Sequence, residues 1–211
     1  MKKNIKYLLI LLAIVIVIMA IIGMNQVVNS KTSNKEKEYL SGKHIVEIDV
    51  EDYGKITVEL DADIAPITVT NFIDLVKDKF YDGLTFHRII EGFMIQGGDP
   101  TGTGYSGSSQ KIKGEFKANG VENTISHVRG VISMARSDDY NSASSQFFIV
   151  QEDSTYLDGN YAAFGKVIEG MEVVDEIAEN TKVEENSNGT VLKENQPVIS
   201  SIRVIENNEE K

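Results

Sequence analysis

Apolar and polar positions alternate along much of the chain from residue 45 onward. The alternation is clearest over 45–50 and 55–60, two runs separated by Tyr53-Gly54, which suits a turn. A period of two residues is typical of a strand with one buried face, so we expect a β-hairpin here. Short apolar runs of the same kind predict further strands, over 85–89, 93–96, 131–135, 147–150, 164–167 and 198–205.

Two segments have helical spacing instead. After Pro66, which a helix tolerates in its first turn, apolar residues recur at Val69, Phe72 and Val76 on one face. Residues 171–178 repeat this spacing. Many short strands with only two helices favour a mainly β fold, a closed antiparallel barrel.

The N-terminus has a different pattern. Lysines at the start of the chain precede an uncharged, strongly apolar run over 7–28, which is long enough to cross the ~30 Å hydrocarbon core of a bilayer. A cleaved signal peptide is the alternative, but its apolar region usually has only ~7–15 residues, and no clear cleavage site follows this run. We therefore expect a single transmembrane helix, with the rest of the chain on the extracytoplasmic side as the positive-inside rule predicts.

These patterns divide the chain into five predicted parts. They are a basic cytoplasmic stub (1–6), the membrane anchor (7–28), a polar linker (29–43), a folded domain (44–206) and an acidic tail (207–211). Residues 1–43 hold seven of the 21 Lys and Arg and two of the 32 Asp and Glu, a net charge of +5; the other 14 basic and 30 acidic residues give −16. So acidic a domain repels nucleic acid, which we do not expect as a partner.

Several classes of chemistry lack the residues they need. The chain has no cysteine, which excludes disulfides, thiol catalysis and thiolate metal sites. The three histidines are His44, His87 and His127, and they lack the spacing of a metal site. We therefore expect neither a metal nor another cofactor. Residues 102–107 match G-x-G-x-x-G, but no helical pattern follows, which argues against nucleotide binding. Ser133 and Ser145 lack the context of a nucleophile.

The most distinctive segment is FHRIIEGFMIQGGD, residues 86–99. Two apolar runs flank a Glu-Gly pair that suits a tight reversal, which predicts a β-hairpin. Regular alternation would put Phe86 and Arg88 on one face of the first strand, with His87 and Ile89 on the other.

On the return strand of this hairpin, Met94 and Gln96 share a face, and a bend near Gly92 would let Phe93 join them. Arg88 would then lie among apolar side chains. Its guanidinium offers five fixed donors, which suit a carbonyl, a carboxylate or a developing lone pair. The alternative is an arginine whose stem covers apolar surface while its head stays in water.

This segment resembles the signature of the cyclophilin-type peptidyl-prolyl cis-trans isomerases. Further matches follow in the order of that family, over 65–72, 80–83, 129–135, 145–149, 157–159 and 164–167. The resemblance covers roughly residues 44–206. It implies an eight-stranded antiparallel barrel with a helix over each open end, and proline-containing polypeptides as substrates.

The resemblance also implies a set of site residues. Arg88 and Gln96 match catalytic positions. The matching substrate-binding positions are His87, Phe93, Met94, Ala135, Gln146, Phe148, Tyr156, Leu157 and Tyr161. Three positions depart from the family pattern: Tyr156 replaces a common Trp, Tyr161 a common His, and Arg136 an Asn of eukaryotic members. These departures leave sensitivity to cyclosporin-like inhibitors open, while the catalytic pair is intact.

The function that these observations predict is prolyl isomerisation during the folding of secreted or surface proteins, by a monomer held at the bilayer. A membrane-tethered chaperone or scaffold that binds proline-containing segments with little turnover is the main alternative. Intact Arg88 and Gln96 favour the enzyme, because simple binding could use neutral donors. A carbohydrate hydrolase would need a pair of carboxylates in a cleft, and the sequence gives no acidic pair such a setting.

Overall fold

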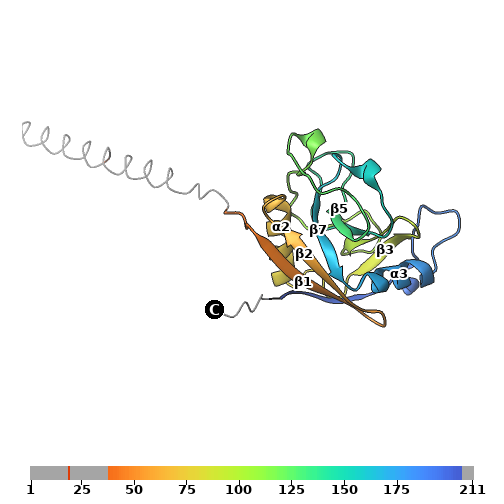
Figure 1. The fold of residues 1–211 in the computed structure, drawn as a ribbon. Helices are drawn as coiled ribbons and strands as arrows, with labels where there is room; N and C mark the ends of the chain where they lie inside the picture. Colours follow the sequence, from red (N-terminus) through yellow and green to blue (C-terminus); the bar gives the residue numbers. More distant parts are fainter. Residues whose placement is uncertain (1–18, 20–37, 206–211) are drawn as a thin grey trace, which may run out of the picture. The chain divides into compact units, whose positions relative to one another are not determined.

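The computed structural model describes residues 19 and 38–205 of the 211-residue chain (Figure 1). The strands are β1 (Lys43–Val50), β2 (Gly54–Asp61), β3 (Thr85–Ile90), β4 (Met94–Asp99), β5 (Val131–Met134), β6 (Phe147–Val150), β7 (Ala163–Glu169) and β8 (Ile199–Ile205). The helices are α2 (Pro66–Lys77) and α3 (Met171–Asn180), with short 3₁₀ turns at Lys117–Asn119, Thr155–Leu157 and Lys193–Asn195. The predicted strands and the two helices predicted within the folded domain are confirmed.

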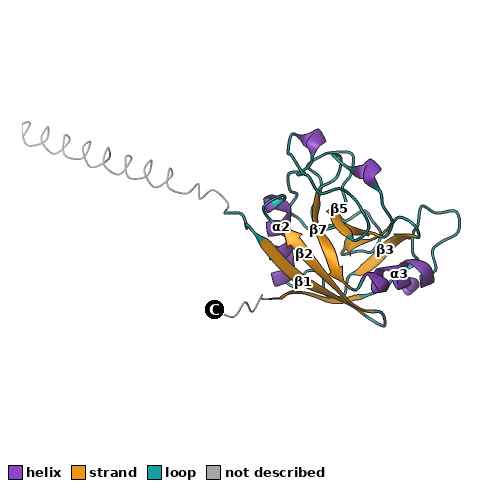
Figure 2. Cartoon of the chain, in the orientation of Figure 1, coloured by secondary structure: helices purple, strands orange, loops and turns teal. Residues whose placement is uncertain are grey.

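The eight strands form one antiparallel sheet in the order β3-β4-β6-β5-β7-β2-β1-β8. Figure 2 shows the strands in orange and the helices in purple. The two outer strands of the sheet approach each other at the start of β3, where Phe86 N donates to Pro197 O at 3.0 Å and Ile199 N donates to Leu84 O at 2.7 Å. Between these strands the described residues show one bridge, Thr85 with Val198. The sheet is thus curled into a half-barrel, and complete closure of the barrel stays a prediction.

The main core fills the inside of the curl. Alternate residues of β1 and β2 are buried there, as their period of two predicts. Helix α2 packs against β2 and β8, and α3 packs against β2 and β4. Phe72 of α2 is wholly buried, with its ring centroid 5.0 Å from Tyr81, 5.5 Å from Phe147 and 5.3 Å from Phe164.

The start of the folded domain precedes β1. Leu40 N donates to Thr70 Oγ1 at 2.8 Å, Gly42 N donates to Asp63 Oδ1 at 2.8 Å, and the Leu40 side chain packs against the core. Residues 40–43, which the sequence assigns to the linker, therefore contact the domain.

The predicted anchor over 7–28 lies outside the described residues apart from Met19, and so do the predicted stub and tail. Within residues 19 and 38–205, the structure contains no helix with the length and apolar character needed to cross a membrane.

Helix α2 is capped by a residue distant in sequence. Its N-cap, Ala65, has no side chain that can accept a hydrogen bond. The carboxylate of Glu115 takes this role, accepting from Ile67 N at 3.0 Å, Thr68 N at 2.8 Å and Thr68 Oγ1 at 2.6 Å. Glu115 is only 2% exposed. The unpaired N–H groups and the positive end of the helix dipole stabilise its buried charge.

We predict that Glu115→Ala lowers the free energy of unfolding by about 2–3 kcal/mol, because it leaves buried donors without an acceptor. Urea denaturation of the purified protein measures the change. The matched control is Glu122→Ala at an exposed position, where we expect a change within about 0.5 kcal/mol. Equal effects of the two substitutions would contradict the capping role of Glu115.

Candidate functional site

The register of the β3–β4 hairpin decides which side chains meet. Arg88 pairs with Gln96, but Phe86 pairs with Gly97, so His87 is an extra residue in β3. Such a bulge changes the alternation of faces. Phe86 consequently lies in the main core together with Ile89. The expectation that Phe86 and Arg88 share a face is therefore wrong, because the bulge at His87 turns Arg88 to the other side.

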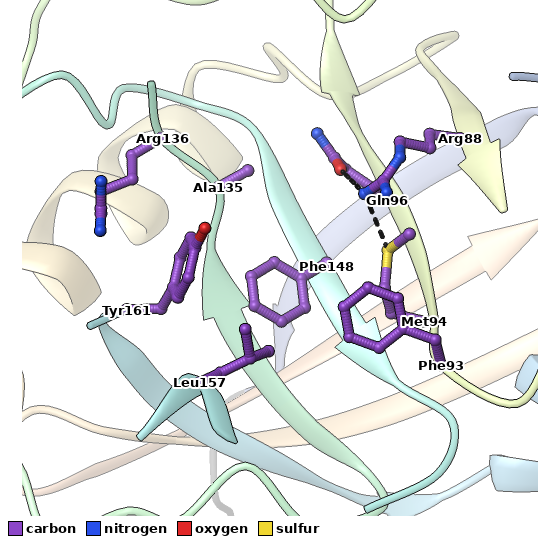
Figure 3. A pocket seen from close by; sticks show the side chains of 9 residues that line it. All are labelled: Arg88, Phe93, Met94, Gln96, Ala135, Arg136, Phe148, Leu157 and Tyr161. Carbon is purple, nitrogen blue, oxygen red and sulfur yellow. Dashed lines mark hydrogen bonds between the residues drawn. The ribbon is translucent and has the colours of Figure 1, made fainter. Parts of the chain in front are cut away.

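The outer face of the hairpin borders a pocket of about 210 Å³ (Figure 3). Its lining comes from four segments, β3–β4, the end of β5, β6 and residues 157–161. The lining residues are Arg88, Phe93, Met94, Gln96, Ala135, Arg136, Phe148, Leu157 and Tyr161. The structure thus brings together both predicted catalytic residues and six of the nine predicted substrate-binding residues.

Most of the pocket wall is apolar. Met94, Phe148 and Leu157 are buried in a second apolar cluster, separate from the main core, and Phe93 packs against it. The Phe148 and Tyr161 rings meet edge to face, with centroids 6.0 Å apart. Figure 3 shows Arg88 and Gln96 on one side of the pocket and Arg136 and Tyr161 on the other. A small apolar ring would fit here with polar groups at its edge.

Arg88 is half-buried and is held by neutral oxygen atoms. Its Nη1 donates to Gln96 Oε1 at 3.2 Å and lies 4.0 Å from Met94 Sδ, and its Nε donates to the Asn188 carbonyl at 2.8 Å. Among the described residues it forms no salt bridge, and its Nη2 makes no protein hydrogen bond. Burial lowers the pKa of Arg88, although a guanidinium stays charged in proteins. The site therefore holds a cation with free donors beside an apolar wall.

Gln96 is held in turn by Gln146. Gln96 Nε2 donates to Gln146 Oε1 at 2.9 Å, and Gln146 Nε2 donates to the carbonyls of Gly104 and Ser106 at 3.0 and 2.6 Å. Gln146 does not line the pocket itself but borders a second cavity of about 600 Å³ next to it. Hydrogen bonds thus run from Arg88 through Gln96 and Gln146 to residues 102–107, the glycine-rich loop.

Two other predicted residues lie outside the pocket lining. Tyr156 is 69% exposed, with its ring centroid 5.9 Å from that of Phe93, which places it at the rim. His87 is 4% exposed, and a side chain on Gly104 would lie 3.5 Å from its ring. Burial lowers the pKa of His87. His87 is therefore buried under the glycine-rich loop, apart from the pocket.

Arg136 lines the pocket although the sequence identified it only as a departure from the family. Its guanidinium carbon lies 4.7 Å from the ring centroid of Tyr161, 4.9 Å from Tyr140 and 5.2 Å from Phe116. Its Nε donates to the Asn160 carbonyl at 3.0 Å. The signal in the sequence was its place directly after Ala135, at the end of a strand that leads into the site.

A serine, a histidine and an aspartate lie in line beneath the pocket. His127 Nε2 is 3.0 Å from Ser133 Oγ, and His127 Nδ1 is 2.8 Å from Asp158 Oδ1. These distances resemble a hydrolytic triad, but Ser133 is 0% exposed and no substrate carbonyl can reach it. The His127 ring stacks on Phe148 at 6.1 Å. The arrangement supports the pocket wall and gives no nucleophile.

Within the described part of the chain, no group of three or more His, Cys, Asp or Glu side chains is arranged to hold a metal ion.

The buried histidines make stability depend on pH. Burial lowers the pKa of His127, although Asp158 opposes the shift. As the pH falls through about 6.5, the unfolded chain therefore binds this proton more readily than the folded chain does, and the folded state loses stability.

We predict that the free energy of unfolding falls between pH 7 and pH 5 and that this fall is smaller in His127→Gln. The two slopes should differ by at most about 1.4 kcal/mol per pH unit, the value for one proton. Denaturation at both pH values measures this. Equal slopes in the two proteins would contradict a neutral buried His127.

Comparisons with known proteins agree with this geometry. The model of the family described as "Cyclophilin type peptidyl-prolyl cis-trans isomerase/CLD" matches residues 45–204. Peptidyl-prolyl cis-trans isomerase B of Bacillus subtilis (strain 168) is 45% identical over 145 residues, covering 69% of this chain and 92% of that protein. Peptidyl-prolyl cis-trans isomerase A of Dickeya dadantii (strain 3937) is 45% identical over 132 residues, covering 60% and 67%.

A solved structure has the same fold. It is a cyclophilin-type peptidyl-prolyl cis-trans isomerase of Cryptosporidium parvum, determined in the presence of the dipeptide Ala-Pro. The TM-score is 0.68 at 32% identity, over 77% of this chain and 99% of that one. Together with the family match and the two relatives, it shows that the chain belongs to the cyclophilin-type peptidyl-prolyl cis-trans isomerases.

Proposed function

We propose that Arg88 provides the catalytic interaction of this peptidyl-prolyl cis-trans isomerase, with Gln96 positioning it. Rotation about an X-Pro bond breaks amide resonance, with a barrier of about 18–20 kcal/mol, and takes tens to hundreds of seconds without a catalyst. No covalent bond forms or breaks between enzyme and substrate. The reaction therefore needs a group that binds the twisted amide better than the planar one, and it needs no nucleophile or metal.

The single observation that carries this proposal is the free Nη2 of Arg88 beside the apolar pocket. As the amide twists, the prolyl nitrogen becomes pyramidal and gains a lone pair that can accept a hydrogen bond. A charged donor in a partly dry site favours that state. Each tenfold acceleration needs about 1.4 kcal/mol of such preference, so one charge-assisted hydrogen bond can supply a large share.

The apolar wall supplies the grip on the proline ring. Met94, Phe148 and Leu157 form a buried surface, and Phe93 lies beside the exposed ring of Tyr156 at the rim. We propose that the wall holds the ring while the rim contacts the flanking residues. The structure from Cryptosporidium parvum was determined in the presence of Ala-Pro, which supports a prolyl peptide as the ligand of this pocket.

The alternative, a chaperone or scaffold with little turnover, would use the same apolar wall. It would have no need of an oriented cation, since neutral donors suffice for binding. Isomerisation and binding assays on the same proline-containing peptide separate the two functions. An enzyme accelerates the exchange between cis and trans forms, whereas a scaffold binds the peptide and leaves the exchange rate unchanged.

We predict that Arg88→Ala lowers kcat/KM by roughly a hundredfold, as the loss of one charge-stabilising donor does in other enzymes, while the fold is kept. Arg88→Lys should also be poor, because an ammonium lacks the planar fork. A protease-coupled isomerisation assay measures both variants. The matched control is Arg203→Ala, which removes an arginine paired with Asp82 on the surface and should keep wild-type activity. A folded Arg88→Ala protein with wild-type turnover would refute the assigned role.

We further propose that residues 7–28 anchor the isomerase in the cytoplasmic membrane, where it acts as a monomer on secreted or surface proteins. The long apolar run and the lysines before it support this location. The net charge of −16 beyond residue 43 fits a domain that stays off an anionic bilayer surface and does not bind nucleic acid.

Cell fractionation tests the anchor. We expect the intact chain in the membrane fraction, resistant to salt and released by detergent, because a span of this length does not leave the bilayer. The matched control is a chain without residues 7–28, which should not enter the membrane fraction. A soluble product that begins near Asn25 would instead identify residues 7–28 as part of a cleaved signal peptide.

A further inference from the structure

The loop that follows α3 runs along the open edge of β3, on the side away from Gln96. Thr190 forms an isolated antiparallel bridge with Arg88. Ile89 N donates to Gly189 O at 2.8 Å, and Val191 N donates to the carbonyl of His87 at 3.0 Å. This short pairing brings the Asn188 carbonyl to the Arg88 head group, where it accepts the Nε–H at 2.8 Å.

The loop also has its own internal hydrogen bonds. Glu184 N donates to Thr190 O at 2.8 Å, Ser187 Oγ donates to Glu184 O at 2.7 Å, and Thr190 N donates to Ser187 Oγ at 3.0 Å. Val183 and Val191 form a further bridge at its base. The turn that presents the Asn188 carbonyl is therefore fixed in shape by its own contacts as well as by β3.

Gly189 is the residue on which this geometry depends. Its φ is +80°, a conformation that L side chains rarely adopt. A Cβ at this position would lie 2.4 Å from the Ile89 carbonyl oxygen and 2.5 Å from Ile90 Cγ1. Any larger residue must move the loop away from β3, and the Asn188 carbonyl would move with it.

We propose that the Asn188 carbonyl is a positioning acceptor for catalysis, which fixes Arg88 so that its Nη2 faces the bound prolyl amide. The inference rests on the catalytic role proposed for Arg88. Gln96 holds the guanidinium at Nη1 and Asn188 holds it at Nε, and two acceptors on different nitrogen atoms fix the plane of a rigid group. Orientation before binding raises the rate, since a misplacement of about 1 Å can cost about a hundredfold.

The substitution that tests the proposal is Gly189→Ala, compared with Gly120→Ala. Both glycines follow an asparagine and have positive φ, +80° and +75°, but a Cβ on Gly120 would have no atom within 4 Å. The control therefore carries the same backbone strain without the collision. In the full chain we expect Gly189→Ala to lower kcat by roughly tenfold to a hundredfold with KM within about twofold, and Gly120→Ala to leave both constants unchanged.

A second readout reports on Arg88 directly. The Nε–H groups of Arg88 and Arg136 both donate to backbone carbonyls, of Asn188 and Asn160. In NMR spectra of the full chain we expect slow hydrogen exchange at both groups, and the Arg88→Lys variant identifies the Arg88 signal by its disappearance. Gly189→Ala should speed exchange at Arg88 at least tenfold and leave Arg136 unchanged.

The acceptor is a main-chain atom, so Asn188→Ala should keep the slow exchange of the Arg88 Nε–H. Loss of this protection in Asn188→Ala would overturn the proposal, because it would assign the role to the side chain. A Gly189→Ala protein with wild-type kcat, or with lowered kcat and an unchanged Arg88 signal, would also overturn it. Wild-type activity in Arg88→Ala would instead refute the underlying role of Arg88, which separates the two failures.

Discussion

The site depends on a guanidinium that is held by neutral oxygen atoms and not by a carboxylate. Arg88 donates to one side-chain amide and one main-chain carbonyl, and among the described residues no acid pairs with it. A carboxylate partner would neutralise the charge and favour the ground state. Neutral acceptors orient the cation and leave its field available to the substrate. The rest of the domain holds this cation beside an apolar pocket.

The fold meets this requirement by keeping two apolar regions apart. The main core fills the curled sheet and the spaces under α2 and α3, while a second cluster on the outer face forms the pocket wall around Met94 and Phe148. The bulge at His87 lets one strand contribute to both regions, because it places Phe86 in the main core and Arg88 at the pocket. Buried polar groups such as Glu115 and His127 hold neighbouring helices and strands in place through hydrogen bonds.

Much of this arrangement could be predicted from the sequence. Period-two alternation predicted the strands. The family resemblance placed every residue of the pocket lining in the site except Arg136, which it marked only as a departure from the family pattern. The bulge at His87 could not be predicted from alternation, because one extra residue reverses the faces without changing the pattern of residue types. The contact from Asn188 was equally hidden, since a main-chain carbonyl has no side-chain signature and the partners are 100 positions apart.

The role proposed for Arg88 requires that it bind the twisted amide better than the planar one. The most direct measurement is the affinity of a twisted-amide analogue of a prolyl peptide relative to its planar counterpart, determined by calorimetry for the wild type and for Arg88→Ala. We expect the wild type to favour the twisted compound, and Arg88→Ala to lose most of this preference while binding the planar compound normally. The same preference in both proteins would contradict the role of Arg88 and would assign catalysis to the apolar pocket alone.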